Sequence, residues 1–287
     1  AMDKEFVTTT DSENALSVTG TFKADGETNT DAVIFSRDDL VLNGTGTLNV
    51  SSTDNGISSK DDLKITGGTL AITCASDALE ANDSVVMADG TVTIQSNKDG
   101  IHAENDEDDL KGYVYIGGGT LNIAAADDAI HATTIAQVDN GTITLSCAEG
   151  LEGTWIQING GKTTIDASDD GINAGRKSSF RTPLVEINGG ELTITMGAGD
   201  TDAVDSNGDL IITGGTIDLT AQSPFDYDGT VQKTGGTIIV NGTETDSITN
   251  QMMGGHGGGK GGFKHGGFNR GGFDQGGFDQ DNGQGGF

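Results

Sequence analysis

The sequence predicts an all-β protein in which one structural unit repeats as a parallel β-helix. A sequence motif of alternating apolar and polar residues around a Gly pair recurs about every 22 residues, for example as LKITGGTLAIT at 63–73 and LIITGGTIDLT at 210–220. This alternation indicates short strands with one buried face. No run shows a helical period, and 47 glycines in 287 residues disfavour helices. Equivalent residues that return at a constant phase are typical of a solenoid.

Each repeat contains three short strands. The first ends just before the glycines, as at Leu63 and Ile65, and the second follows them, as at Leu70 and Ile72. Glycine permits the sharp bend between them because it has no Cβ. A third strand begins about five residues after the second and reads Asp-Gly/Ala-Ile. We expect about nine to ten coils, spaced by about 4.8 Å. A β-sandwich is the alternative, but it does not explain the constant phase.

The repeats divide the chain into three parts. Residues 1–30 are expected to form an N-terminal lead-in or cap, 31–250 the β-helix domain, and 251–287 a Gly/Phe-rich low-complexity tail. The tail is interpreted as a disordered linker, with an adhesive segment that contacts a neighbouring molecule as the alternative. Insertions at 104–113 and 175–184 lengthen two coils, and such loops commonly carry binding specificity.

The net charge of −29 restricts the possible partners. The charges of the tail cancel, so the excess of acids lies on residues 1–250. This acidity argues against a nucleic-acid partner and favours cations. Arg176, Lys177 and Arg181 form the only dense positive cluster. No run of 18 apolar residues is present, so we expect no membrane span.

The two cysteines, Cys74 and Cys147, share a position where other coils carry small residues. They are three coils apart, or roughly 14 Å by the strand spacing. This separation exceeds the reach of a disulfide. We therefore expect two buried free thiols.

Acidic residues recur where each third strand begins. The residue before Gly/Ala forms a column, the acidic ladder, of Asp31, Asn55, Asp77, Asp99, Asp128, Glu149, Asp170 and Asp202, and Asp226 is expected to close it. The residue three positions later forms a second column of Ser58, Glu80, His102, His131, Glu152, Asn173 and Asp205. Further acids stand beside these columns at Asp54, Glu104, Asp127 and Asp169.

Stacked carboxylates repel one another, so the ladder must be either well solvated or bridged by cations. Several oxygen ligands per site, shared between two coils, suit Ca²⁺ rather than Zn²⁺. We favour calcium because the acids are in phase with the coils; a solvated acidic edge is the alternative. The candidate ligands are Asp31, Asp77, Glu80, Asp99, Asp127, Asp128, Glu149, Glu152, Asp169, Asp170, Asp202 and Asp205.

Two other features are candidate contacts. His102 and His131 occupy one column in adjacent coils, which is interpreted as surface stacking, with a metal or ligand contact as the alternative. Trp155 is the only tryptophan and is expected to face outward or to lie at a corner. It is either a packed corner residue or a platform for a sugar ring. The candidate carbohydrate contacts are Trp155, Arg176, Lys177 and Arg181.

Repeats of the form I-x-G-G-T-L-x-I followed by D-D-A/G-I-x-A resemble the clostridial carbohydrate-binding β-helix family, whose fold is similar to that of family-nine pectate lyases. The resemblance covers roughly residues 30–245. It implies a right-handed parallel β-helix, structural calcium ions on the Asp-rich turns, an extracellular or cell-surface location, and binding to cellulose or polygalacturonate. By motif, it implies that the calcium ligands are Asp77, Asp99, Asp128, Asp170 and Asp202, with Glu80 and Glu152 beside them. Asn55 and Glu149 depart from the Asp pattern, which puts a site there in doubt.

A non-catalytic carbohydrate binder is the function that the sequence favours. An acidic body repels polygalacturonate, so calcium or the 176–181 cluster would have to overcome that repulsion. A calcium-dependent lyase is the enzymatic alternative, with Lys98 as the candidate base. A structural surface or matrix protein is the third class, because a β-helix has open ends and the tail offers a contact for self-association.

Overall fold

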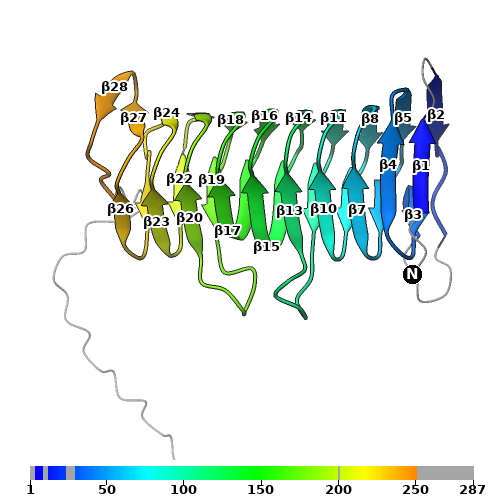
Figure 1. Ribbon diagram of the computed structural model, residues 1–287, viewed down its shortest axis with the longest axis horizontal. Helices are drawn as coiled ribbons and strands as arrows, with labels where there is room; N and C mark the ends of the chain where they lie inside the picture. Colours follow the sequence, from blue (N-terminus) through cyan, green and yellow to red (C-terminus); the bar gives the residue numbers. More distant parts are fainter. Residues whose placement is uncertain (1–3, 9–11, 24–29, 200, 251–287) are drawn as a thin grey trace, which may run out of the picture. The chain divides into compact units, whose positions relative to one another are not determined.

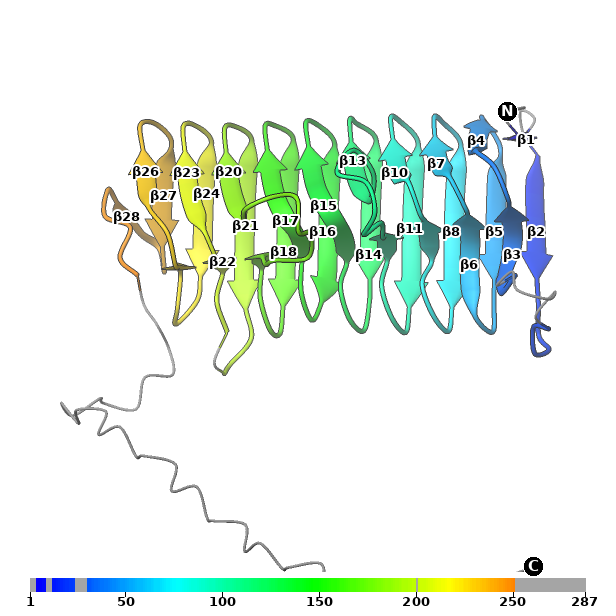
Figure 2. The same ribbon diagram turned by 90° about the horizontal axis from the view of Figure 1, so that it is seen from below.

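The computed structural model describes residues 4–8, 12–23, 30–199 and 201–250, and these form a parallel β-helix (Figure 1). Figure 2 shows the successive coils lying side by side along one axis. This described part contains only strands and irregular segments, and it has no helix that could cross a membrane. The predicted fold class is confirmed. The predicted tail at 251–287 lies outside the described residues.

The strands form three ladders, named here by their order within a coil. The first ladder consists of β1 (Lys4–Thr8), β4 (Leu40–Gly44), β7 (Asp62–Ile65), β10 (Ser84–Met87), β13 (Tyr113–Ile116), the C-terminal parts of β15 (Ile130–Val138) and β17 (Leu151–Ile158), β20 (Leu184–Ile187), β23 (Asp209–Ile212) and β26 (Val231–Lys233). The second consists of β2 (Glu13–Ser17), β5 (Thr47–Ser51), β8 (Thr69–Cys74), β11 (Thr91–Ser96), β14 (Thr120–Ala124), β16 (Thr142–Cys147), β18 (Lys162–Ala167), β21 (Glu191–Met196), β24 (Thr216–Thr220) and β27 (Thr237–Val240). The third consists of β3 (Ala32–Ser36), β6 (Asn55–Ser59), β9 (Leu79–Ala81), β12 (Ile101–Ala103), the N-terminal parts of β15 and β17, β19 (Ile172–Ala174), β22 (Val204–Ser206) and β25 (Asp226–Tyr227).

The core is a set of apolar columns that run through the coils. Ile72, Ile94 and Ile123 pair in register along the second ladder, and each is buried. Because adjacent strands lie about 4.8 Å apart, each side chain packs on its counterparts in both neighbouring coils. The alternation of the sequence therefore places one residue type inward and the next outward, as predicted.

Glycine is required at the bend between the first and second strands. Gly119 has φ of +86°, and a Cβ there would lie 2.5 Å from the carbonyl oxygen of Gly90 in the preceding coil. A larger residue would therefore clash with the backbone of its neighbour and adopt a disfavoured conformation. In the first repeat, positive φ falls at Gly44 rather than at the glycine expected from the pattern, Gly46.

The ends of the ladders differ. In the segment expected as an N-terminal lead-in or cap, β1 pairs with β4 and β2 pairs with β5, so both strands extend the ladders. At the other end, β28 (Thr243–Thr245) pairs antiparallel with β27 and covers the edge of the second ladder. Antiparallel closure removes the unpaired parallel edge at which another coil would add.

Both cysteines are free thiols, as predicted. Cys74 is buried and Cys147 is half-buried. Burial raises the pKa of each thiol to about 12, so both thiols stay protonated at neutral pH.

Replacing one inward residue tests the contribution of the core columns. Ile194 is fully buried, and Ile194→Ala should lower the free energy of unfolding by about 2–5 kcal/mol because it leaves a cavity. Thr193→Ala, on the outer side of the same strand, should change it by less than about 0.5 kcal/mol. Urea denaturation followed by circular dichroism measures both, and equal losses would contradict the core assignment.

Candidate functional site

Side chains of the acidic ladder accept hydrogen bonds from backbone N–H groups of the ladder residues themselves. One side-chain oxygen at each of four positions accepts a hydrogen bond from the backbone N–H of the corresponding residue in the next coil. The distances are 3.0 Å for Asn55 to Asp77, 3.0 Å for Asp77 to Asp99, 3.1 Å for Asp99 to Asp128 and 3.0 Å for Asp170 to Asp202. Buried backbone donors need such acceptors. One residue of the sequence indicates this role. Asn55 replaces Asp in the ladder, and its side-chain oxygen can accept the same hydrogen bond although it carries no charge.

The pairing of the strands differs from the predicted ladder at both of its ends. Asp202 pairs with Ser223, whereas Asp226 pairs with Asp205 in the second column. Ser223 therefore occupies the last described ladder position, and the placement of Asp226 there was wrong because this coil is shorter than the spacing of the acids suggested. At the other end Asn55 pairs with Ala32, so Asp31 lies one residue before the ladder position.

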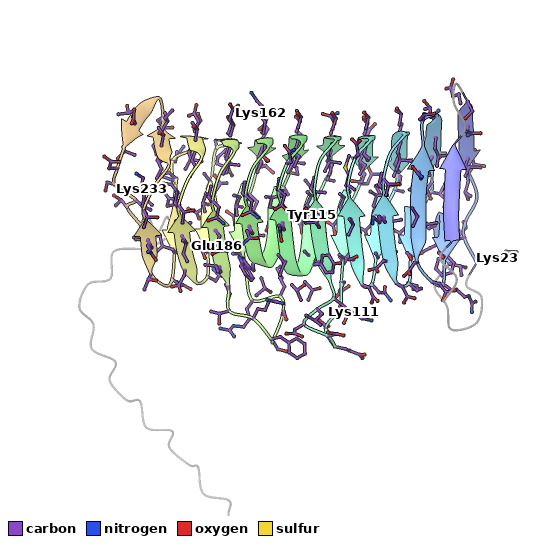
Figure 3. All side chains as sticks on the ribbon, in the orientation of Figure 1. Lys23, Lys111, Tyr115, Lys162, Glu186 and Lys233 are labelled. Atoms are coloured by element: carbon purple, nitrogen blue, oxygen red, sulfur yellow. The ribbon has the colours of Figure 1, made fainter. Side chains whose placement is uncertain are left out.

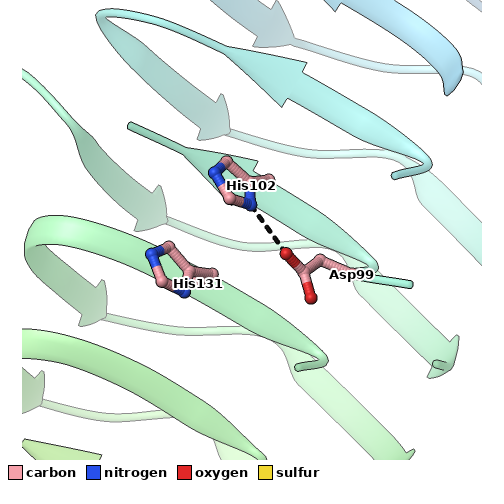
Figure 4. Close-up of side chains that lie close together, drawn as sticks. All are labelled: Asp99, His102 and His131. Carbon is pink, nitrogen blue, oxygen red and sulfur yellow. Dashed lines mark hydrogen bonds and ion pairs between the residues drawn. The ribbon is translucent and has the colours of Figure 1, made fainter. Parts of the chain in front are cut away.

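The two histidines lie at the centre of the second column, as predicted (Figure 4). Their rings stack with centroids 4.6 Å apart and an angle of 5° between planes. His102 Nδ1 lies 2.6 Å from Asp99 Oδ2, and His131 Nδ1 lies 3.0 Å from Asp128 Oδ2. His131 Nδ1 is also 2.5 Å from Glu152 Oε2. Each imidazole is therefore held by the carboxylate three residues before it.

Positive side chains of the protein compensate part of the charge of these central carboxylates, although burial and the neighbouring Glu152 and Asp99 still raise the pKa of Asp128 to about 7. Lys98 Nζ lies 2.9 Å from Asp77 Oδ2 and 3.8 Å from Asp99 Oδ2. Although burial opposes ionisation, the hydrogen bond and charge of His102 lower the pKa of Asp99. Burial likewise works against a charged His131, but the hydrogen bonds of Asp128 and Glu152 raise its pKa to about 10. His131 is thus an imidazolium at neutral pH.

Glu152 is a second buried carboxylate of this central group, in addition to Asp99. Its side chain is 6% exposed, and its Oε1 accepts the ammonium group of Lys177 from the second insertion. Burial would raise its pKa, but the hydrogen bonds of His131, Asp128 and Lys177 lower it. Lys177, predicted as a carbohydrate contact, therefore binds a carboxylate of the protein itself.

The carboxylates nearer the C-terminal coils have other carboxylates as their charged neighbours. Burial, and then the charges of Asp170, Asp226 and Asp202, raise the pKa of Asp205 to about 7. Burial and the charges of Asp202 and Asp169 raise the pKa of Asp170 to about 6, although the N–H of Asp202 opposes this shift. Such mutual repulsion between buried acids is relieved when a cation binds.

Oxygen-only donor sets, which suit calcium, occur both in the C-terminal coils and in one group of the central coils. Asp170, Asp202, Asp205 and Asp226 offer only oxygen ligands, which a hard cation prefers. Two central groups contain imidazole nitrogen, as in Asp128 with His131 and Glu152, whereas the third, of Asp99, Asp127 and Asp128, offers only carboxylate oxygens. Among the other predicted ligands, Asp127 and Asp169 are exposed, and Asp31, Glu80 and Glu149 are half-buried.

Some predicted ligands have partners within the protein. Glu80 Oε2 accepts a hydrogen bond from Asn55 Nδ2 at 2.8 Å, and Glu149 Oε2 accepts one from Asn173 Nδ2 at 2.9 Å. Burial and the charge of Glu152 nevertheless raise the pKa of Glu149 to about 8. Glu149 is therefore largely neutral at pH 7, where its ladder neighbour Asp170 is mostly ionised.

Two inserted loops, at 104–112 and 175–183, project from the coils (Figure 1). Buried threonines of β15 and β17 hold them. Thr133 Oγ1 accepts a hydrogen bond from the N–H of Asn105 at 3.1 Å, and Thr134 Oγ1 donates to the carbonyl of Lys111 at 2.6 Å. Thr154 Oγ1 accepts the N–H groups of Lys177 and Ser178, at 3.1 and 2.7 Å. Both loops are therefore anchored to adjacent coils.

Of the predicted carbohydrate contacts, the structure brings Trp155 and Arg181 together, and both have partners within the protein. Trp155 faces outward and is half-buried, and its Nε1 donates to Glu186 Oε2 at 3.1 Å. Arg181 lies over the Trp155 ring, 5.8 Å from its centroid, and donates to the carbonyl of Asp109 in the other loop at 2.9 Å. Arg176 is exposed. Figure 3 shows Glu186 on the same face as Tyr115.

Comparison with known proteins gives two matches. A family model described as "Carbohydrate-binding domain-containing protein" matches residues 1–203 and 147–257 of the chain. A solved structure of a polysaccharide lyase-like protein from C. thermocellum, in a gadolinium derivative, is 33% identical, with a TM-score of 0.49. That match covers 56% of this chain and 64% of the other, so the chain spans less than two thirds of that protein. No curated protein matches.

The anchoring of the second loop is testable with one isosteric change. Thr154→Val removes the oxygen that accepts two backbone N–H groups and should cost about 1–3 kcal/mol, mainly by releasing the loop. Limited trypsin digestion should then cut at Arg176, Lys177 or Arg181 faster than in the wild type. Thr164→Val, on the outer side of β18, is the matched control. Equal digestion rates in all three proteins would contradict the anchoring role.

Proposed function

The chain belongs to the family of carbohydrate-binding domain-containing proteins, and we propose that it is an extracellular, non-catalytic protein that binds polysaccharide and carries calcium on its acidic ladder. The family match over most of the chain is the observation that carries the proposal. Cellulose and polygalacturonate are the two ligands that the family resemblance implies.

The environment of Lys98 supports a non-catalytic role. A lyase needs a neutral base to remove a proton next to the uronate carboxylate. Burial lowers the pKa of Lys98, but the hydrogen bond and charge of Asp77, with the charge of Asp99, raise it overall. Its ammonium group is also paired with Asp77 at 2.9 Å. A lysine held in its charged form is poorly suited to act as a base.

Calcium at the C-terminal coils is the second part of the proposal. Asp170, Asp202, Asp205 and Asp226 would hold the ion, which would neutralise their repulsion and tie three coils together. In the central coils, Lys98, His131 and Lys177 supply positive charge instead. We therefore propose calcium at the C-terminal group in preference to the carboxylates of Asp99, Asp127 and Asp128, because Lys98 and His102 lie beside Asp99 and His131 lies beside Asp128.

Chelation should make stability depend on pH. Folding raises the pKa of Asp170 to about 6 and of Asp205 to about 7, from 3.8. The folded state therefore binds more protons, and this contribution is complete below about pH 4 and is lost as pH rises through 6 and 7. In EDTA the melting temperature should fall by several degrees between pH 5 and pH 8.

Calcium should reduce this fall, because the bound ion replaces the protons of Asp170 and Asp205, while the raised pKa values of Glu149 and His131 should leave part of it. In Asp205→Asn, calcium should raise the melting temperature less than in the wild type, whereas Asp166→Asn, on the outer side of β18, should behave as the wild type. Differential scanning calorimetry measures all three proteins. Superimposable melting curves with and without calcium at pH 8 would rule out the proposed ion.

Retention on insoluble cellulose and on immobilised polygalacturonate tests the binding function directly. The full chain with calcium should be retained on at least one of them, and polygalacturonate with calcium should give no unsaturated product absorbance. If the chain is retained on neither matrix, the proposed binding function is contradicted. Growth of the absorbance would instead show that the protein is a lyase.

A further inference from the structure

One outward face of the first ladder carries two parallel columns across β13, β15, β17 and β20. The apolar column consists of Ile135, Trp155 and Leu184, which pair in register, and of Tyr113, which precedes the pair of Val114 with Ala136. The polar column consists of Tyr115, Gln137, Gln157 and Glu186. All eight side chains are half-buried. The only tryptophan and two of the three tyrosines of the sequence lie in these columns, so aromatic surface is concentrated here on a chain that has little of it.

Hydrogen bonds within the protein hold the polar column in place. Gln157 Nε2 and Trp155 Nε1 both donate to Glu186 Oε2, at 2.8 and 3.1 Å. Gln137 Nε2 and the Tyr115 hydroxyl each donate to one oxygen of Asp139, both at 2.8 Å. Side chains that are already ordered lose little conformational entropy when a ligand binds. The face therefore presents a preorganised row of amide and carboxylate groups beside apolar rings.

The charges around this face favour a neutral ligand. Glu186 and Asp139 are its acidic groups, and a uronate carboxylate placed on them would be repelled. Three cations of the adjoining loops are held by acceptors within the protein. Lys111 pairs with Asp83 at 2.9 Å, Lys177 with Glu152, and Arg181 with the carbonyl of Asp109. Lys111 and Lys177 are thus neutralised by carboxylates of the protein, whereas Arg181, whose acceptor is a neutral carbonyl, keeps its charge over the Trp155 ring.

The spacing of the columns favours an extended chain. Successive coils are about 4.8 Å apart, which is close to the length of one residue in an extended β-1,4-linked glycan. Neighbouring residues of such a chain are turned over relative to one another, so every second sugar residue would meet its side chains in the same orientation. A pyranose ring has an apolar C–H face and a hydroxyl edge, and these match the apolar and polar columns. Aromatic surface with a few fixed polar groups is typical of ligand sites.

We propose that the two columns bind one neutral, extended β-linked glycan chain along the solenoid axis, with one sugar residue to each of the four coils. The apolar column contacts the ring faces, and Gln137, Gln157 and Glu186 receive the hydroxyl groups. This inference rests on the proposed carbohydrate-binding function and assigns the class and the place of its ligand.

Calorimetric titration of the full chain, with calcium present, tests the assignment. The probes are cello-oligosaccharides of two to six residues and oligogalacturonates of the same lengths. Affinity for the neutral series should rise up to about four residues and then level off, because four coils carry the columns. The galacturonates should bind at least about tenfold more weakly, which corresponds to about 1.4 kcal/mol.

Two variants locate the site. Trp155→Ala and Gln157→Ala should each weaken cello-oligosaccharide binding by about tenfold or more, whereas Gln95→Ala, on the outer side of β11, should bind as the wild type. Thermal melting checks that each variant folds, and Gln157→Ala decides the matter if Trp155→Ala does not.

The outcomes separate the two proposals. Cello-oligosaccharide binding that Gln157→Ala leaves unchanged overturns the assigned site, while the carbohydrate-binding function stands. Tighter binding of galacturonates overturns the neutral ligand class. If no oligosaccharide binds and insoluble cellulose and polygalacturonate also fail to retain the chain, the carbohydrate-binding function itself fails.

Discussion

In-register hydrogen bonding between successive coils is the constraint on which the rest of the structure depends. It brings every side chain to within about one strand spacing of its counterpart in the next coil. Apolar residues gain from this proximity, and the result is a core of stacked Ile, Leu and Val columns. Polar residues obey the same geometry, so one acid repeated at one phase becomes a column of neighbouring charges. The acidic ladder is thus a direct product of the coil register.

The ladder has a structural role before it has an electrostatic one. Its side chains accept backbone N–H groups of the next coil, and Asn55 does so without a charge. The repulsion between the carboxylates is a consequence of using Asp as this acceptor. In the central coils His102, His131 and the two lysines offset that repulsion. Around Asp170 and Asp205 the charged neighbours are further carboxylates, and the proposed calcium would relieve their repulsion there.

The repeated parts of the molecule were predictable from the sequence, because alternation and glycine spacing are local properties. The three strands of each coil and the shared column of His102 and His131 follow from them. The ends were less predictable, since a coil of different length shifts the register, as the pairing of Asp202 with Ser223 shows. The partners of Lys177 and Arg181 depend on how the two loops fold back, which no local pattern records. The outward position of Ile135 was not predictable from the alternation, because the register shifts between Ala132 and Ile135.

Anomalous diffraction from crystals grown with calcium tests the central claim most directly, namely that stacked acids are compensated by the protein's own cations in the central coils and by calcium in the C-terminal coils. The account predicts an anomalous peak among Asp170, Asp202 and Asp205, and none between Asp99 and His102. A peak at the central coils, or none at the C-terminal group in the presence of calcium, would contradict it.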